Sequence, residues 1–414
     1  MRLLIALTVA TILVACSGSN ASPSTQAILP ILPTVTVEGG FVTIPTVQSS
    51  TDVTPTIAAT DASFVPAPEP PAAANIEPIP MNLDPLEVGS VGADTVLGQH
   101  MRSLEEAGLF SGSVLVARRG EILLRHGYGM ASRTIRNTAT TKFRLASLTK
   151  QFTAVLILRL HEQGKLNIDD GICSYLEFCP AHWAPITIRE LLSHSSGIPD
   201  YTDFLDFDKR QATPTTRDQL IARFRDQPLI FTPGSMYKYS NSGYVLLGQI
   251  LEYITGMPYA DLLKNELCIP LGLNDTDYDH SIAGNDPTLA LGLYAMGVPA
   301  APIDSSTLNS AGALYSTIDD LYRWDRALHD GQVLKPDTLT LMRTPQLRNY
   351  ALGVMRNPLA GMTSVHHDGM ASGIRTFLGN FPDPDITVVV LSNYENADVV
   401  NIAAYLGVLA RDMP

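Results

Sequence analysis

The chain has 414 residues, of which 45% are hydrophobic, so it can bury a large core in one big domain or two ordinary ones. This content excludes a protein that is disordered as a whole. Its net charge of -13 at pH 7 argues against nucleic-acid binding, which requires a basic surface.

The amino terminus resembles a bacterial lipoprotein signal. A Met-Arg start is followed by an apolar run over residues 3–12 and by Leu-Val-Ala-Cys, which ends at Cys16 like a lipobox. The apolar run is too short for a comfortable membrane span. We therefore expect 1–16 to be a signal peptide with its lipobox, and Cys16 to carry a lipid that anchors the protein in the bacterial cell envelope. An uncleaved anchor helix with an incidental cysteine is the alternative.

Residues 17–92 are rich in Pro, Thr, Ser, Ala and Val, and no Lys or Arg occurs between Arg2 and Arg102. Such a composition cannot build a packed core, and its proline clusters favour polyproline II. We interpret 17–92 as a disordered tether that holds a soluble domain off a membrane. As a flexible coil of some seventy residues it would span about 50 Å. The alternative is a small extra domain with strands in 35–47.

Both ends of the remaining chain carry strand signals. Residues 93–107 have helical spacing, and 112–117 and 122–127 flank a turn-like segment, which predicts a helix followed by a β-hairpin. Further strands and a last helix are expected near the carboxyl end, at 351–354, 364–367, 374–378, 386–391 and 398–411. We therefore predict an α+β domain over 93–414: an antiparallel sheet from both chain ends, flanked by helices, with an inserted mostly helical region and the active cleft between the two.

Ser147 and Lys150 open an apolar, helix-like run that continues to Leu160. At a spacing of three they share a helix face, which places the amine within proton-transfer reach of the hydroxyl. A buried lysine loses part of its preference for the charged form and can act as a neutral base toward a serine. The helix amino terminus also offers partial positive charge where an alkoxide would develop.

The Ser-x-x-Lys motif alone is weak, because it is expected by chance about once or twice in such a chain. Ser235 and Lys238 also match it, but they follow a Pro-Gly turn signal and open no apolar helix, so we set them aside. The alternative for Ser147 is an N-cap of a core helix.

The four cysteines suit an exported protein. Cys173 and Cys179 could close a short disulfide loop, or both could be buried thiols; the sequence leaves both readings open. Cys268 is left over, and we expect it to be buried.

Two further clusters carry groups suited to acyl chemistry. Tyr239 offers a phenol that can relay protons, and Asn241 an amide that can donate to a substrate carbonyl and accept from a lysine. The alternative is a surface turn that caps the helix expected from Tyr244. On a predicted strand, adjacent His366 and His367 point to opposite faces, so at most one lines a site.

These three clusters, in this order and spacing, resemble the penicillin-binding and serine β-lactamase family. Ser147-Leu-Thr-Lys150 matches its nucleophile motif, Tyr239-Ser-Asn241 its second motif, and His367-Asp368-Gly369 its third. The segments 186–201, 270–276 and 311–321 agree. The likeness covers nearly all of 93–414 and is greatest for the branch of class C β-lactamases, DD-peptidases and carboxylesterases, whose fold matches the architecture predicted above.

The resemblance implies a serine hydrolase that works through an acyl-enzyme without metal or cofactor. Ser147 would attack an acyl carbon of a small-molecule or peptide substrate, and Lys150 and Tyr239 would move protons. The N–H groups of Ser147 and Met370 would form the oxyanion hole, and the remaining substrate-binding residues would be Asn241, His367, Asp368 and Gly369. Esters, amides, D-amino-acid peptides and β-lactams all remain open as substrates, so a D-alanyl-D-alanine carboxypeptidase or a β-lactamase is an alternative.

Asp368 departs from the family pattern, which usually has a hydroxyl there that helps to hold the substrate carboxylate. An ionised Asp368 would repel such substrates, which predicts a preference for neutral or amine-bearing ones. The alternative is that Asp368 turns toward a surface Arg or Lys and has little effect.

Other function classes fit less well. A Ser-His-Asp hydrolase is disfavoured because no Gly-x-Ser-x-Gly elbow occurs. A metal hydrolase built on His366, His367 and Asp368 lacks a supporting ligand pair. The main non-enzyme alternative is a penicillin-binding sensor lipoprotein that is acylated but does not turn over.

Overall fold

The computed structural model describes residues 77, 89–281 and 286–414. The predicted signal peptide, Cys16 and almost all of the predicted tether over 17–92 lie outside these residues. Among the described residues, no helix combines the length and apolarity needed to cross a membrane. Val91 forms a bridge with Arg125, so contacts with the sheet begin slightly before residue 93.

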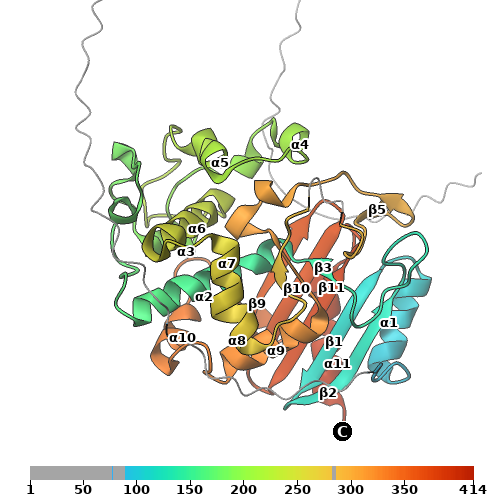
Figure 1. Ribbon diagram of the computed structural model, residues 1–414. Coiled ribbons are helices and arrows are strands. Elements are labelled where there is room, and N and C mark those ends of the chain that lie inside the picture. The colour runs from blue at the N-terminus through green and yellow to red at the C-terminus, as the bar shows by residue number, and fades with distance from the viewer. Residues whose placement is uncertain (1–76, 78–88, 282–285) are drawn as a thin grey trace, which may run out of the picture. The chain divides into compact units, whose positions relative to one another are not determined.

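The centre of the fold is a six-stranded sheet in the order β2-β1-β11-β10-β9-β8, in which every neighbouring pair is antiparallel (Figure 1). Its strands are β1 (Gly112–Arg118), β2 (Glu121–Tyr128), β8 (Met355–Leu359), β9 (Met362–Ala371), β10 (Ile374–Phe381) and β11 (Ile386–Ser392). Val114 of the first strand is paired with Val390 of the last. The predicted antiparallel sheet made from both chain ends is therefore confirmed.

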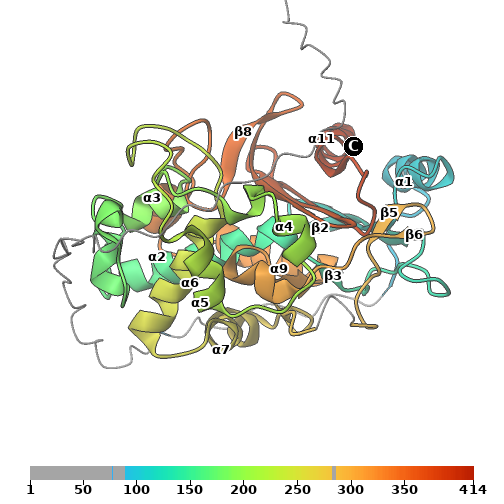
Figure 2. The same ribbon diagram turned by 90° about the horizontal axis from the view of Figure 1, so that it is seen from above.

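Helices cover both faces of the sheet. Helices α1 (Val96–Glu106) and α11 (Val399–Asp412) pack together on one face (Figure 2), over a core that includes Leu97, Phe377 and Leu406. The opposite face contacts α9 (Ile318–His329) and the larger core of the inserted region. Apolar residues alternate less strictly along β11 than in a half-exposed strand, because both of its faces are buried.

The chain between the two sheet-forming ends is mostly helical, as predicted. Its helices are α2 (Thr149–Glu162), α3 (Ile188–Leu192), α4 (Phe207–Arg210), α5 (Arg217–Phe224), α6 (Asn241–Thr255), α7 (Tyr259–Leu263), α8 (Ile269–Leu271), α9 and α10 (Pro336–Met342). Two small sheets join them: β3 (Phe143–Arg144), β7 (Leu314–Ser316) and β4 (Asp277–Tyr278), and the hairpin of β5 (Leu293–Ala295) and β6 (Val298–Pro299). Helix α2 is enclosed through its first twelve residues, which explains why its sequence is apolar on all sides.

The predicted strand at 351–354 is wrong. These residues form a buried turn, and β8 begins only at Met355. Gly353 has a left-handed φ of 80°, and a Cβ there would lie 2.5 Å from the Ala154 side chain. The segment is apolar because it packs against α2, and burial of this kind cannot be distinguished from a short strand by its pattern alone.

Cys173 and Cys179 form a disulfide with a Cα–Cα distance of 5.3 Å. It joins residues six apart in sequence, within the connection between α2 and α3. Cys268 is a buried free thiol, and burial raises its pKa.

Candidate active site

Ser147 lies in a tight turn between β3 and α2, and not inside a regular α-helix. Residues 146–148 form a single 3₁₀ turn, and Ala146 has a left-handed φ of 48°. The turn is held by two hydrogen bonds of Leu145: its N–H donates to Leu314 (2.7 Å), and its carbonyl accepts from the Thr376 hydroxyl (2.8 Å). Strands β7 and β10 therefore fix the position of the serine turn at the start of α2.

Lys150 reaches the Ser147 hydroxyl from the first turn of α2. Its Nζ lies 3.1 Å from Ser147 Oγ, 2.8 Å from Asn241 Oδ1 and 2.8 Å from the Ala311 carbonyl oxygen. The side chain is fully buried, and this burial lowers its pKa to about 7 against the opposing charges of Asp200 and Asp368. A neutral amine that donates to Asn241 and Ala311 has its lone pair left for the serine proton.

Tyr239 donates a hydrogen bond from its phenol to Ser147 Oγ (2.8 Å). Burial raises its pKa well above the usual value, so it stays a neutral phenol. Lys150 Nζ lies 4.8 Å from the centre of the Tyr239 ring. Of the two groups that contact the serine, the lysine is thus the better base and the tyrosine the better proton donor.

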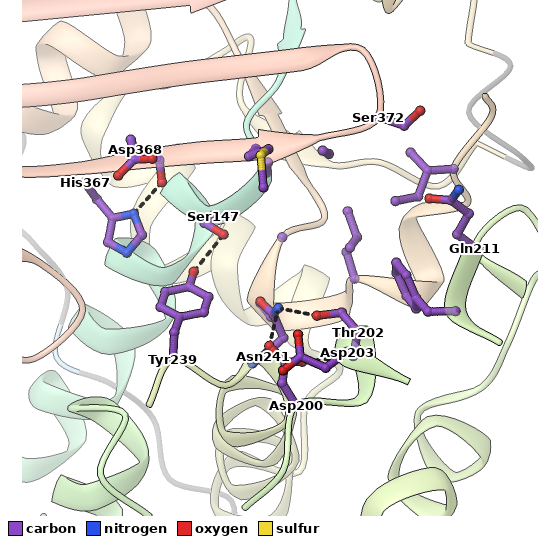
Figure 3. A pocket seen from close by; sticks show the side chains of 18 of the residues that line it. Ser147, Asp200, Thr202, Asp203, Gln211, Tyr239, Asn241, His367, Asp368 and Ser372 are labelled. Atoms are coloured by element: carbon purple, nitrogen blue, oxygen red, sulfur yellow. Dashed lines mark hydrogen bonds between the residues drawn. The ribbon is translucent and has the colours of Figure 1, made fainter. Parts of the chain in front are cut away.

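Asn241 is oriented by a residue that sequence reasoning missed. Asp200 accepts hydrogen bonds from the Asn241 backbone N–H (3.0 Å) and from its amide Nδ2 (2.9 Å), and Thr202 Oγ1 accepts from the same Nδ2 (3.2 Å). Figure 3 shows the amide nitrogen bonded to both acceptors, and the amide oxygen accepts a hydrogen bond from Lys150 Nζ. The only sequence signal for Asp200 was its position in the segment 186–201, one of those that carry the family resemblance.

Strand β9 runs directly beside the serine turn. A Cβ at Gly369 would lie 2.2 Å from Thr376 Oγ1, 2.4 Å from the Leu145 carbonyl oxygen and 3.1 Å from the Ser147 nitrogen. Only a glycine allows this approach. Met370, the next residue, is 65% exposed at the rim of the cavity.

The two histidines on β9 separate as predicted. His366 bonds to Ser364 (2.9 Å) and stacks on Phe377, away from the serine. His367 lines the cavity, but both of its ring nitrogens have protein partners: Nδ1 donates to the Asp368 carbonyl (2.6 Å), and Nε2 accepts from Tyr350 (2.9 Å). Burial and nearby Lys150 lower its pKa to about 3, so it remains neutral.

These groups open into a cavity of about 790 Å³ between the sheet and the helical region (Figure 3). The predicted residues that line it are Ser147, Tyr239, Asn241, His367, Asp368 and Met370. Sequence reasoning missed other lining residues, among them Asp200, Tyr237, Tyr350 and Glu395. Tyr237 lies two residues before the second motif, whereas Asp200, Tyr350 and Glu395 lie in segments outside all three motifs.

The second Ser-x-x-Lys match does not form a comparable site. Ser235 is exposed and donates to the Thr232 carbonyl oxygen (2.6 Å), while Lys238 forms an ion pair with Asp203 (3.1 Å). Its serine and lysine therefore serve separate surface contacts.

The family model described as beta-lactamase matches residues 94–411. The chain is 31% identical over 325 residues to penicillin-binding protein 4* of Bacillus subtilis, an alignment that covers 71% of this chain and 70% of that protein. Among solved structures, the octameric penicillin-binding protein homologue from Pyrococcus abyssi is 25% identical with a TM-score of 0.69 and covers 76% of each chain. A penicillin-binding protein from Bacillus halodurans is 26% identical with a TM-score of 0.66, over 75% of this chain and 99% of that one.

Proposed function

The chain belongs to the beta-lactamase family of serine acyl-transferring hydrolases, and on that premise we propose that it hydrolyses esters, amides or D-amino-acid peptides through an acyl-enzyme on Ser147. The observation that carries the proposal is the placement of the buried Lys150 amine among Ser147, Asn241 and Ala311. This arrangement aims a base of near-neutral pKa at one serine hydroxyl.

In the first half of the reaction Lys150 takes the hydroxyl proton while Ser147 Oγ bonds to the acyl carbon. The N–H groups of Ser147 and Met370 would stabilise the negative charge that develops on the carbonyl oxygen. In support, a Cβ on Gly369, the residue before Met370, would lie 3.1 Å from the Ser147 nitrogen. When the tetrahedral intermediate collapses, Tyr239 gives a proton to the leaving group and is reprotonated from Lys150. Water then attacks the acyl-enzyme ester, and the same proton transfers run in reverse, so that Ser147 Oγ is protonated as it leaves. The acid product is released and Ser147 is restored.

The charges around the cavity favour neutral or amine-bearing substrates over anionic ones. Its lining includes Asp200, Asp203, Asp208, Asp368 and Glu395 but only one lysine, Lys238. Asp200 is engaged with Asn241 and Asp203 with Lys238, whereas Asp368 lies on the strand that would hold a substrate carboxylate. Burial raises the pKa of Asp368, and the positive charges of Arg375 and Lys150 oppose that shift.

A direct test is intact-mass detection of an acyl-enzyme across β-lactams, acyl-D-Ala peptides and neutral short-chain esters, combined with turnover rates. We expect labelling and steady-state release with neutral esters or amides, and weak turnover of β-lactams and carboxypeptidase substrates. Ser147→Ala abolishes both labelling and turnover, while Ser235→Ala, the matched control, retains both. Labelling without release on every substrate would instead identify the sensor alternative, and labelling lost only in Ser235→Ala would refute the choice of serine.

We further propose that the protein is lipid-anchored through Cys16 in the cell envelope. The support is the lipobox-like end of the apolar run over 3–12 and the tether-like composition of 17–92. The disulfide between Cys173 and Cys179 fits an oxidising compartment.

A further inference from the structure

His194 is a buried residue beside the proposed proton donor. It lies in the segment 186–201 but in none of the three motifs, and the mechanism does not use it. It follows α3, is 2% exposed, and has a left-handed φ of 56°. Its carbonyl oxygen accepts from the Lys238 backbone N–H (3.0 Å), and its ring Nδ1 accepts from the Ser240 backbone N–H (3.1 Å). One residue thus holds the backbone on both sides of Tyr239.

The His194 ring also packs on the Tyr239 ring itself, with centroids 4.1 Å apart and planes inclined by 32°. Tyr350 and Tyr244 pack against the same imidazole, at centroid distances of 4.6 and 5.1 Å. The Tyr239 hydroxyl points out of this aromatic packing toward Ser147. His194 therefore fixes both the main chain and the ring of Tyr239, and with them the position of the phenol that contacts Ser147.

The hydrogen bond to Ser240 requires a neutral imidazole, since Nδ1 must accept. Burial and the neighbouring Lys150 hold the pKa of His194 well below its usual range, so the ring keeps this acceptor as the pH falls. Ser240 is itself buried, and its N–H would be left without this partner if Nδ1 were removed.

We propose that His194 is a positioning residue for the Tyr239 proton donor, acting through its Nδ1 acceptor and its backbone carbonyl; this inference rests on the proposed acyl transfer at Ser147. A residue that only fills space could be replaced by any ring of similar size. A positioning residue needs the acceptor at Nδ1, and asparagine carries an oxygen at the matching place on Cγ and tolerates left-handed φ.

The experiment compares His194→Phe and His194→Ala, which lack the acceptor, with His194→Asn, which keeps it. With a neutral alkyl ester, whose alkoxide leaving group must be protonated as it departs, the first two variants lower kcat by at least about tenfold, because displacement of a catalytic group by roughly 1 Å can cost about 10²-fold. KM changes little, since the affected step is proton transfer. The kcat of His194→Asn stays within about threefold of the wild-type value, which indicates that Tyr239 is still positioned.

A double-mutant cycle shows whether His194 acts through Tyr239. In a Tyr239→Phe background, His194→Phe lowers kcat by less than about threefold further, because the group that it positions is already absent. Ser193→Ala is the matched control: it removes buried hydrogen bonds to Arg189 (2.8 Å) and Ser195 (2.9 Å) in the same segment and lowers the melting temperature without changing kcat.

The inference is overturned if a folded acceptor-less variant keeps its kcat, if His194→Asn is as impaired as His194→Phe, or if the double mutant is fully additive. If neither variant that lacks the acceptor folds, the kcat of His194→Asn decides the question. A retained kcat supports the inference, and a loss of about tenfold overturns it. Turnover that survives in Ser147→Ala would refute the proposed function itself. A Ser147-dependent wild type with an unimpaired His194→Phe refutes the role of His194 alone.

Discussion

At the residue scale, the surroundings of Lys150 decide how the rate depends on pH. The folded protein lowers the pKa of this lysine to about 7 through burial, and the reaction needs its neutral form. Tyr239 is needed as the protonated phenol, and burial raises its pKa, so it remains protonated over the same range. Rate and pH are therefore linked through the lysine.

We predict that the acylation rate falls about tenfold for each pH unit below 7, the slope of a single ionisation, and is level between about pH 8 and 9. Stopped-flow acylation of wild type by a neutral ester between pH 5 and 9 measures this profile, with Ser235→Ala as a control that must superimpose on it. An apparent pKa near that of an exposed lysine would show that Lys150 is not the base.

Asp368 provides a second prediction at this scale. At roughly 5 Å and an effective dielectric of about 20, its charge would repel a substrate carboxylate by about 3 kcal/mol, or about 10²-fold in kcat/KM. Asp368→Thr should shift the kcat/KM ratio of a chromogenic cephalosporin to a neutral p-nitrophenyl ester toward the cephalosporin by at least about tenfold.

The control for this substitution is Asp208→Thr, which removes an exposed carboxylate from the lining of the same cavity on the helical side. It should leave the substrate ratio near the wild-type value. Equal ratios in wild type and Asp368→Thr would show that charge on this strand does not set specificity.

At the scale of single elements, sequence pattern was most informative where one element buries one continuous surface. Apolar runs and turn signals predicted the extent of α2, the β1–β2 hairpin and α11. It failed at 351–354, where the chain is buried without being a strand. The turn at Ala146 was also missed, because a left-handed alanine leaves no mark in composition and depends on the strands that hold Leu145.

The close approach of β9 to this turn leads to a prediction for Gly369. Its Cβ would overlap Thr376 Oγ1 and the Leu145 carbonyl oxygen, so Gly369→Ala must move the strand away from the serine turn. We expect kcat/KM to fall by about 10²-fold, as for a misplacement of roughly 1 Å, and stability by about 1 to 3 kcal/mol for overpacking. Ester kinetics and urea unfolding measure the two effects.

Gly171→Ala is the matched control for Gly369→Ala. At this position φ is -64° and a Cβ would meet only ordinary contacts, the nearest at 3.7 Å from the Ala184 carbonyl oxygen. This variant should retain its activity. If Gly369→Ala were as active as this control, β9 would not form part of the oxyanion site.

At the scale of the whole molecule, the two-part architecture was predictable because strand and helix signals segregate along the chain. The residues that assemble the site were less so: Asp200, His194 and Tyr350 act through contacts with residues far away in sequence. Apart from the position of His194 and Asp200 in the segment 186–201, a single sequence shows each of them as an ordinary polar or aromatic residue. Tertiary packing assigns their partners: Asp200 and His194 contact residues within the helical region, and Tyr350 contacts His367 of β9.

The anchoring proposal is tested on the full-length protein. Wild type should partition with membranes and carry a diacylglyceryl mass increment on a mature peptide that begins at Cys16, whereas Cys16→Ser accumulates as unprocessed precursor. Limited proteolysis should cut first within the predicted tether over 17–92 and release an active fragment. A soluble wild-type protein with an intact, unlipidated Met1 would contradict the proposal, and Cys268→Ser, which alters a buried thiol, is the control.

Because β1 pairs with β11, the central sheet can form only long after β1 has been synthesised. The hairpin over 112–128 is made early, but its neighbour over 386–392 emerges only after the whole helical region, a delay on the order of 10 to 60 s at about 5 to 20 residues per second. During that interval β1 has an unpaired, highly apolar edge. The nascent chain therefore cannot complete its central sheet until its last strands are available.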